Sequence, residues 1–264
     1  MNKTYWLSLC FEMIEDYIPK GVAPYNESNH IRNKFEQISD HAITVAEFCQ
    51  LKHYSENEQG RIADIFINAG FGHYSTANYD SAIRLYINGL NIMKSILGSE
   101  HQKVAFMCGN IALAYQEQSN FKDATKWYDE ALLIYEKLPE VPYPEAASIL
   151  NGIGLLHHEQ SEYEKAMESL NKALEICEKV LGENNDITAT TYLNIAYTSR
   201  DRGDYDTAFL WYNKALKIRE RILNEQHPSM ATIYSNIADI LQKQGNYEEA
   251  LDLNFRALSI RENL

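Results

Sequence analysis

One unit of the chain, residues 231–261, reads ATIYSNIADILQKQGNYEEALDLNFRALSIR and decides the fold. In its first half, apolar residues recur at helical spacing from Ile233 to Leu241. Gly245 then ends this helix, because glycine takes the left-handed backbone conformation at a helix end at little cost. A second helix begins at Tyr247, again with apolar residues three and four positions apart. The unit is therefore predicted to be a helix-turn-helix pair.

The same unit occurs five times at a period of 42 residues, without insertion or deletion. Equivalent positions carry the same kind of residue: Tyr79, Phe121, Tyr163, Tyr205 and Tyr247; Ala82, Ala124, Ala166, Ala208 and Ala250; Leu90, Leu132, Leu174, Leu216 and Leu258. A fixed period of this size is typical of solenoids, in which each unit needs its neighbours to cover an apolar face. Solenoids form binding surfaces far more often than catalytic pockets.

Small residues mark the places where the two helices of a unit are expected to cross. They lie in the first helices, twelve residues before the alanine series: Gly70, Ala112, Gly154, Ala196 and Ala238. Two helices approach closely only where side chains are small. The aromatic series that starts each second helix is expected to wedge between neighbouring units.

The repeats are predicted to occupy residues 61–264, preceded by an N-terminal helical cap over residues 1–60. The cap contains a short helix that ends near Pro19 and a longer one from Ile31 to about Leu51, which can cover the first repeat. At the other end no polar helix follows Leu264, so the last repeat is expected to expose apolar surface. A continuation of the chain, a partner or a second copy would cover it.

Composition excludes several classes of protein. The net charge of −13 repels phosphate backbones, and no basic stripe counteracts it, so nucleic acid is not an expected partner. No apolar run approaches the length that spans a bilayer, and the N-terminus is unlike a signal peptide, so no membrane association is expected. The four cysteines are widely spaced and predicted to be buried in a reducing compartment. We expect a cytoplasmic protein.

The unit resembles the tetratricopeptide repeat, with its small residue, alanine, aromatic-rich second helix and proline near the next unit. The longer period and the connector, seen in Leu97-Gly-Ser-Glu-His101 and Leu223-Asn-Glu-Gln-His227-Pro228, resemble the kinesin-light-chain type. The resemblance covers roughly residues 60–264 and implies an all-α, right-handed superhelical solenoid with a concave groove. Residues 38–48 also resemble the junction that precedes the C-terminal sensor repeats of bacterial NB-ARC/STAND-type ATPases.

Four asparagines in the first helices form a ladder that only Gly152 interrupts: Asn68, Asn110, Asn194 and Asn236. An amide side chain both donates and accepts hydrogen bonds, which suits the backbone of an extended peptide. In kinesin-light-chain-type repeats the matching asparagines hold peptide backbone, so the resemblance implies the same role here. The residues alone also allow a second interpretation, in which the asparagines join neighbouring helices.

Further candidates for the groove surround this ladder. They are apolar at Phe71, Leu113, Leu155 and Tyr197, polar at Tyr74, Gln116, His158, Arg200 and Gln242, and acidic at Glu117, Glu159 and Asp201. The acids are either solvated helix ends or an acidic rim for ligands with Lys or Arg, an effect that Arg200 and Lys243 would weaken. The spaced Lys/Arg of carboxylate-clamp repeats are absent from the first helices, which disfavours capture of a free C-terminus.

No catalytic motif is found. The adjacent His157 and His158 point about 100° apart on a helix, so they cannot share a metal ion. Gly70 and Gly154 are crossing positions and not parts of phosphate loops, and no P-loop motif exists. We expect no catalytic residue, metal site or cofactor, and hence no enzyme.

The sequence thus favours a scaffold that binds a protein or peptide in its concave groove, as a sensor or adaptor module of a larger bacterial signalling protein. One alternative is a structural or oligomerisation scaffold that self-associates through the uncapped C-terminal repeat. Another is the non-catalytic region of an enzyme whose catalytic domain lies outside this chain. A peptide-pheromone receptor of the Rap type is a third, although residues 1–60 match its N-terminal bundle poorly.

Overall fold

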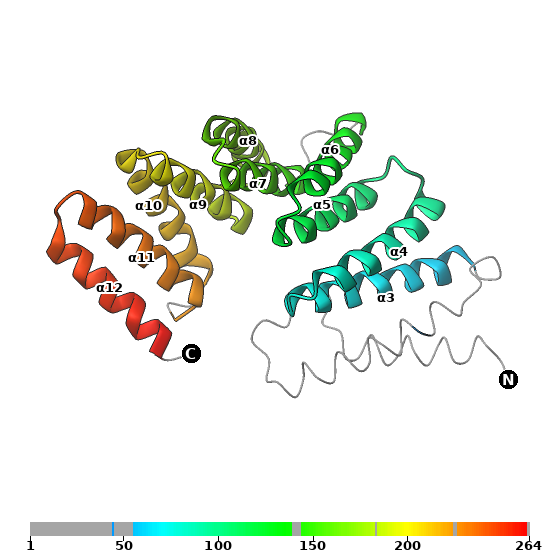
Figure 1. Cartoon of the computed structure of the whole chain (residues 1–264), viewed down its shortest axis with the longest axis horizontal. Helices are drawn as coiled ribbons and strands as arrows, with labels where there is room; N and C mark the ends of the chain where they lie inside the picture. Colours follow the sequence, from blue (N-terminus) through cyan, green and yellow to red (C-terminus); the bar gives the residue numbers. More distant parts are fainter. Residues whose placement is uncertain (1–43, 45–54, 139–143, 183, 224–225, 263–264) are drawn as a thin grey trace. The chain divides into compact units, whose positions relative to one another are not determined.

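The computed structural model describes Thr44 and residues 55–138, 144–182, 184–223 and 226–262. In these residues it contains ten α-helices and no strand, as Figure 1 shows. The chain divides into two compact units, Met1–Pro139 and Glu140–Leu264. The all-α repeat fold predicted from the 42-residue period is confirmed.

The first unit holds two helix pairs. Helix α3 (Glu56–Ser75) packs against α4 (Tyr79–Leu97), and α5 (Gln102–Glu117) packs against α6 (Phe121–Lys137). Helix α4 also packs against α5, so the second helix of one repeat contacts the first helix of the next. This alternation is what a stacked array requires, because each pair covers the apolar face of its neighbour.

The second unit holds three pairs built in the same way. They are α7 (Pro144–Glu159) with α8 (Tyr163–Ile176), α9 (Asp186–Asp201) with α10 (Tyr205–Ile222), and α11 (Pro228–Lys243) with α12 (Tyr247–Glu262). A π-helical segment, Cys177–Leu181, extends α8. Every second helix begins at the aromatic residue that the sequence predicted. The core between these helices contains Ile195, Tyr212, Ile233 and Ile240, all almost fully buried.

The turns within the pairs share one backbone conformation. The residue at the same position of each turn has a positive φ: Ala77, Ser119, Ser161, Gly203 and Gly245. In the first turn the amide of Ala77 donates to the carbonyl of Tyr74 and that of Asn78 to His73, which is a Schellman-type helix end. The prediction for Gly245 is confirmed, with φ 84°. Three repeats adopt the same turn without glycine, because the packing of both helices fixes its path.

The predicted crossing points are confirmed by the two glycines among them. A Cβ added to Gly70 would lie 2.6 Å from the ring of Tyr86, and one added to Gly154 would lie 2.6 Å from Cγ of Leu170. Both neighbours are buried. The alanine series of the second helices is buried as well, at Ala82, Ala124, Ala166, Ala208 and Ala250. Helix pairs are therefore closest where the sequence placed its smallest residues.

The connectors between repeats provide helix caps. The side chains of His101, Asn185 and His227 each accept a hydrogen bond from the backbone amide two residues later, at the start of α5, α9 and α11. Pro228 occupies the first turn of α11, as predicted, where the missing N–H costs nothing. The histidine shared by two connectors thus has a local structural role.

Several expectations fall on the rest of the chain. The cap predicted for residues 1–60 lies outside the described residues, except that α3 already begins at Glu56. The same holds for Cys10, Cys49 and the segment of residues 38–48. Cys108 and Cys177 are free and buried, and burial raises the pKa of the Cys108 thiol to about 12. Among the described helices, none has the length and apolarity needed to cross a bilayer.

Candidate functional site

Asn194 of the predicted ladder is part of the packing between α7 and α9. Its side chain is only 9% exposed, and its Nδ2 donates to Oδ1 of Asn151 at 3.3 Å. Asn151 in turn donates to Oγ1 of Thr191 at 2.8 Å. Asn194 therefore joins neighbouring repeats, as the second interpretation of the ladder proposed. The break of the ladder at Gly152 is compensated one residue earlier, at Asn151.

The other three asparagines keep partly exposed side chains. Asn236 on α11 accepts a hydrogen bond from Nη1 of Arg200 at 3.2 Å. Asn110 on α5 makes a long contact to Sδ of Met107, at 3.9 Å, and Asn68 lies on α3. Within each unit the asparagines do not contact one another. Their contact with a peptide stays a prediction.

Helix α5 carries three of the other candidates. Gln116 is 6% exposed, and its Oε1 accepts from the hydroxyl of Tyr128 at 3.0 Å. It therefore does not offer the free polar tip that the sequence predicted, because its amide satisfies a buried phenol. Glu117 is exposed and accepts from the hydroxyls of Tyr74 and Tyr79. Leu113 is half-buried on the same helix.

Tyr128 and Tyr212 occupy equivalent positions but differ in their hydrogen bonding. Both are almost completely buried. The hydroxyl of Tyr128 bonds to Gln116, whereas that of Tyr212 has no partner among the described residues. Burial also raises the pKa of Tyr212 above its usual value.

We predict that Tyr128→Phe lowers the free energy of unfolding by about 1–3 kcal/mol, because Gln116 loses its partner in the core. Tyr212→Phe is expected to raise it by up to about 1 kcal/mol, because an unpaired buried hydroxyl is removed. Urea denaturation at pH 7 measures both changes. Equal losses in the two variants would contradict the assignment.

The Tyr212→Phe variant should also gain relative to wild type as pH rises above about 10. In that range unfolded Tyr212 loses its proton while the folded residue, whose pKa is raised, keeps it. Ionisation therefore favours the unfolded wild type, and the variant escapes this loss.

A line of polar side chains joins three successive first helices in the second unit. Nε2 of His158 on α7 lies 3.0 Å from Oδ2 of Asp201 on α9. Nε of Arg200 donates to Oδ1 of Asp201 at 2.8 Å, and Nη1 donates to Asn236 on α11. His158 is 8% exposed, so it is not the free polar tip that the sequence predicted. Its contact with Asp201 explains its burial, because a buried polar ring needs a partner.

Tyr197 lies between two members of this line. Its ring centre is 4.5 Å from that of His158 and 4.5 Å from the guanidinium carbon of Arg200. The residue is nevertheless 37% exposed. Burial alone would lower the pKa of Arg200, but the hydrogen bond to Asp201 and the nearby acidic groups outweigh it and raise the pKa. Arg200 is thus a fixed, permanently charged group beside an accessible aromatic ring.

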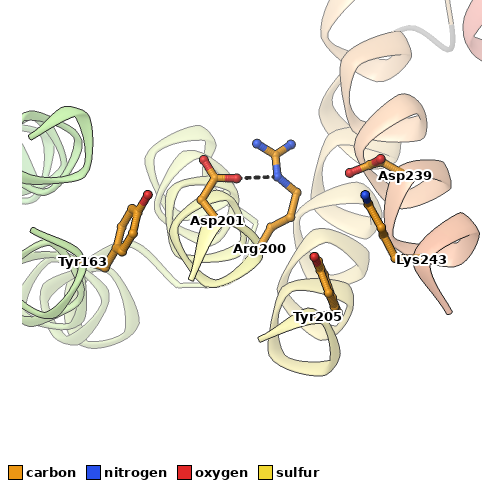
Figure 2. A pocket seen from close by; sticks show the side chains of 6 residues that line it. All are labelled: Tyr163, Arg200, Asp201, Tyr205, Asp239 and Lys243. Carbon is orange, nitrogen blue, oxygen red and sulfur yellow. Dashed lines mark hydrogen bonds and ion pairs between the residues drawn. The ribbon is translucent and has the colours of Figure 1, made fainter. Parts of the chain in front are cut away.

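A polar pocket of about 530 Å³ opens beside this line (Figure 2). It is lined by Tyr163, Arg200, Asp201, Tyr205, Asp239 and Lys243. Sequence reasoning named Arg200 and Asp201 as candidates and missed the other four as members of one site. Tyr163 and Tyr205 were assigned to the packing series at the start of the second helices. The 42-residue spacing that relates them could have shown that they recur beside the ends of the first helices.

The two adjacent histidines do not form a metal site with each other. Nδ1 of His157 lies 2.8 Å from Oε2 of Glu162, and His158 contacts Asp201. Within the described ranges, no three His, Cys, Asp or Glu side chains converge in a way that could hold a metal ion. Glu159, the remaining acidic candidate, is exposed at the end of α7.

Comparison with protein families gives one match that spans most of the chain. The family model described as tetratricopeptide repeat matches residues 61–137, 103–179, 145–221 and 187–263. These overlapping stretches begin 42 residues apart, at the period of the ladders. Among curated proteins, none matches the sequence.

Several solved structures share the fold. BtubC (BKLC) from P. vanneervenii has a TM-score of 0.74 at 18% identity, over 90% of this chain and 92% of that one. A kinesin light chain-like repeat protein from Podospora anserina has a TM-score of 0.61 at 18% identity, over 78% of this chain and 97% of that one. A Rap protein in complex with competence and sporulation factor has a TM-score of 0.68 at 16% identity, over 99% of this chain and 68% of that one.

Proposed function

We propose that this chain, which belongs to the tetratricopeptide repeat family, binds a protein or peptide along the surface of its first helices. The observation that carries the proposal is the line from His158 through Asp201 and Arg200 to Asn236. It fixes polar groups on three successive first helices before any ligand arrives. Preformed groups of this kind bind at a lower entropic cost than mobile ones.

The surface next to this line is suited to a peptide. Tyr197 offers a large, partly exposed ring, and Asn236 and Arg200 offer hydrogen-bonding groups on the adjacent helices. Asn68, Asn110, Leu113, Glu117 and Glu159 would extend the surface along the array. Asn194, Gln116 and His158 are better assigned to supporting it, because each is buried against a neighbouring side chain.

We assign the chain to the sensor or adaptor class, as a non-catalytic module of a bacterial signalling protein in the cytoplasm. The two free, buried cysteines that are described favour a reducing compartment. The Rap protein that shares the fold was solved with competence and sporulation factor, which supports a peptide as ligand. That alignment covers 99% of this chain, so the objection raised by residues 1–60 loses weight. The NB-ARC/STAND connection rests on the short segment of residues 38–48.

Selection from a random peptide library displayed on phage tests the proposal. We expect wild type to enrich a peptide family that binds Tyr197→Ala and Asn236→Ala at least about tenfold more weakly, because both variants remove contacts at the proposed surface. Lys172→Gln is the control, since Lys172 is exposed on α8 and pairs only with Glu168. The proposal is wrong if no peptide is enriched, or if the enriched peptides bind all four proteins equally.

A second candidate function, self-association, is favoured by α12. Its exposed apolar residues form one stripe: Tyr247 at 69%, Leu251 at 57%, Phe255 at 60% and Leu258 at 47%. The equivalent residues of α10 include Tyr205, Phe209 and Leu216, which pack against the core next to α11. The stripe therefore has the register of an internal repeat junction. A scaffold that associates through α12 would cover it.

A further inference from the structure

The pocket in Figure 2 is built from the ends of four helices. Tyr163 and Tyr205 are the first residues of α8 and α10, whereas Arg200 and Asp201 lie at the end of α9 and Lys243 at the end of α11. The side chains surround a common space, and most of the surface they present is polar. The composition of this lining decides which chemical group fits.

Arg200 is held in place with one edge of its guanidinium unused. Nε donates to Asp201 and Nη1 to Asn236, while the plane lies over Tyr197. Its side chain is 19% exposed. Nη2 makes no hydrogen bond to the described residues. A guanidinium fixed in this way presents its remaining donors at a set position, which is the arrangement that binds oxyanions best.

The other unused groups are mostly donors as well. Among the described residues, the hydroxyls of Tyr163 and Tyr205 and the ammonium of Lys243 have no hydrogen-bond or ion-pair partner. Asp239 supplies the one carboxylate of the pocket in the same condition, because Asp201 is already bound to Arg200 and His158. Donors therefore exceed acceptors, so the missing group is rich in acceptor oxygens.

Charge narrows the choice further. The two cations of the pocket are balanced by Asp201 and Asp239. A phosphate, with a charge of about −1.5 to −2, would meet strong repulsion from Asp239 on this already acidic protein. A cationic side chain would meet Lys243 and the free edge of Arg200. A single carboxylate gains both cations and meets only one unpaired acid.

We propose that this pocket binds a carboxylate, supplied by an Asp or Glu side chain of the partner. The proposal rests on the proposed function, because it names the group that the partner would place there. Arg200 and Lys243 bind the two oxygens from α9 and α11, and the tyrosine hydroxyls of α8 and α10 donate to them. The partner would thus bridge three successive repeats of the second unit.

The test uses small probes, so it does not depend on a peptide being found. N-acetyl-glutamic acid α-amide carries the side-chain carboxylate, and N-acetyl-glutamine α-amide is its neutral control. Two-dimensional NMR of the ¹⁵N-labelled chain follows the backbone amides near residues 200–205 and 239–243. We expect saturable shifts with the acidic probe and none with the neutral one. Equal shifts with both probes, or none with the acidic one, would overturn the proposal.

Two lysine variants of equal charge locate the effect. Lys243→Gln is expected to weaken binding of the acidic probe at least about fivefold, because a charge-assisted contact is lost. Lys217→Gln, at an exposed position of α10 outside the pocket, should leave binding unchanged. The same weakening in both variants would mean a general charge effect and would overturn the site. Neither variant removes a buried group, so both should fold.

A third probe separates the two sources of a carboxylate. N-acetyl-glycine carries it at the chain end, as a free C-terminus does. Tighter binding of this probe than of the glutamic acid probe would overturn the side-chain assignment. Failure of the peptide selection with success of these probes would remove the proposed function and leave the pocket's chemistry in place.

Discussion

Replacing Gly154 with leucine is expected to lower the free energy of unfolding by about 3 kcal/mol, near the upper end of what overpacking costs. Even a Cβ at this position would lie 2.6 Å from Cγ of Leu170 and 3.4 Å from the carbonyl oxygen of Ala166. Leu170 is completely buried, so it has no free space to move into. Helices α7 and α8 would have to separate, and the contacts of α8 with α9 would weaken with them.

Gly60→Ala provides the matched control. Gly60 also lies inside a helix, α3, but a Cβ there would meet no atom within 4 Å. Alanine should therefore stabilise the protein by about 0.8–1 kcal/mol through helix propensity alone. Urea denaturation followed by circular dichroism measures both variants. If Gly154→Leu were as stable as wild type, the close crossing of α7 and α8 would be wrong.

The second large effect is expected at α12. Replacing Leu251 and Phe255 together with glutamate should abolish concentration-dependent self-association. The apolar stripe on this helix exposes roughly 400 Å² of side chain, the size at which patches commonly mark interaction sites. Two carboxylates placed in its centre would have to be buried without partners in any complex, which costs several kcal/mol.

A pair of antiparallel α12 helices is the arrangement we expect for the wild type. The first half of α12 carries Glu248, Glu249 and Asp252, and the second half carries Arg256 and Arg261. Antiparallel pairing about a two-fold axis sets the acidic half of one copy against the basic half of the other. The stripe is then buried against itself.

Light scattering coupled to size-exclusion chromatography measures the mass over a range of concentrations. The control replaces Leu133 and Leu210 with glutamate, because these leucines are equally exposed but lie on α6 and α10, outside the stripe. We expect the control to associate like wild type and the α12 variant to remain monomeric. A wild type that is monomeric at every concentration would exclude this second function.

Much of the fold could be predicted from the sequence. The aromatic series gave the first residue of every second helix from Tyr79 to Tyr247, and the small residues gave the crossing points at Gly70 and Gly154. The positive φ of Ala77, Ser119 and Ser161 could not be predicted, because these residues do not favour it and adopt it only as parts of a repeated turn. The boundary between cap and repeats stays a prediction.

The candidate site was only partly predictable. Position in the repeat correctly selected the first helices but could not separate exposed from buried side chains. Asn194, Gln116 and His158 were chosen as polar groups facing a ligand, yet each is buried against a specific partner. Those partners are Asn151, Tyr128 and Asp201, which lie 43, 12 and 43 residues away. Lys243 and Asp239 gained importance only when the structure placed them beside Arg200.

The sequence by itself therefore determined the architecture: five helix pairs, their register and their crossing points. Apolar spacing and side-chain size act locally and repeat every 42 residues, so one unit contains nearly all the information for the others. Only the tertiary structure decided which polar groups are paired and which remain available at the pocket. A hydrogen bond depends on the distance between two particular atoms, and here those atoms come from different repeats.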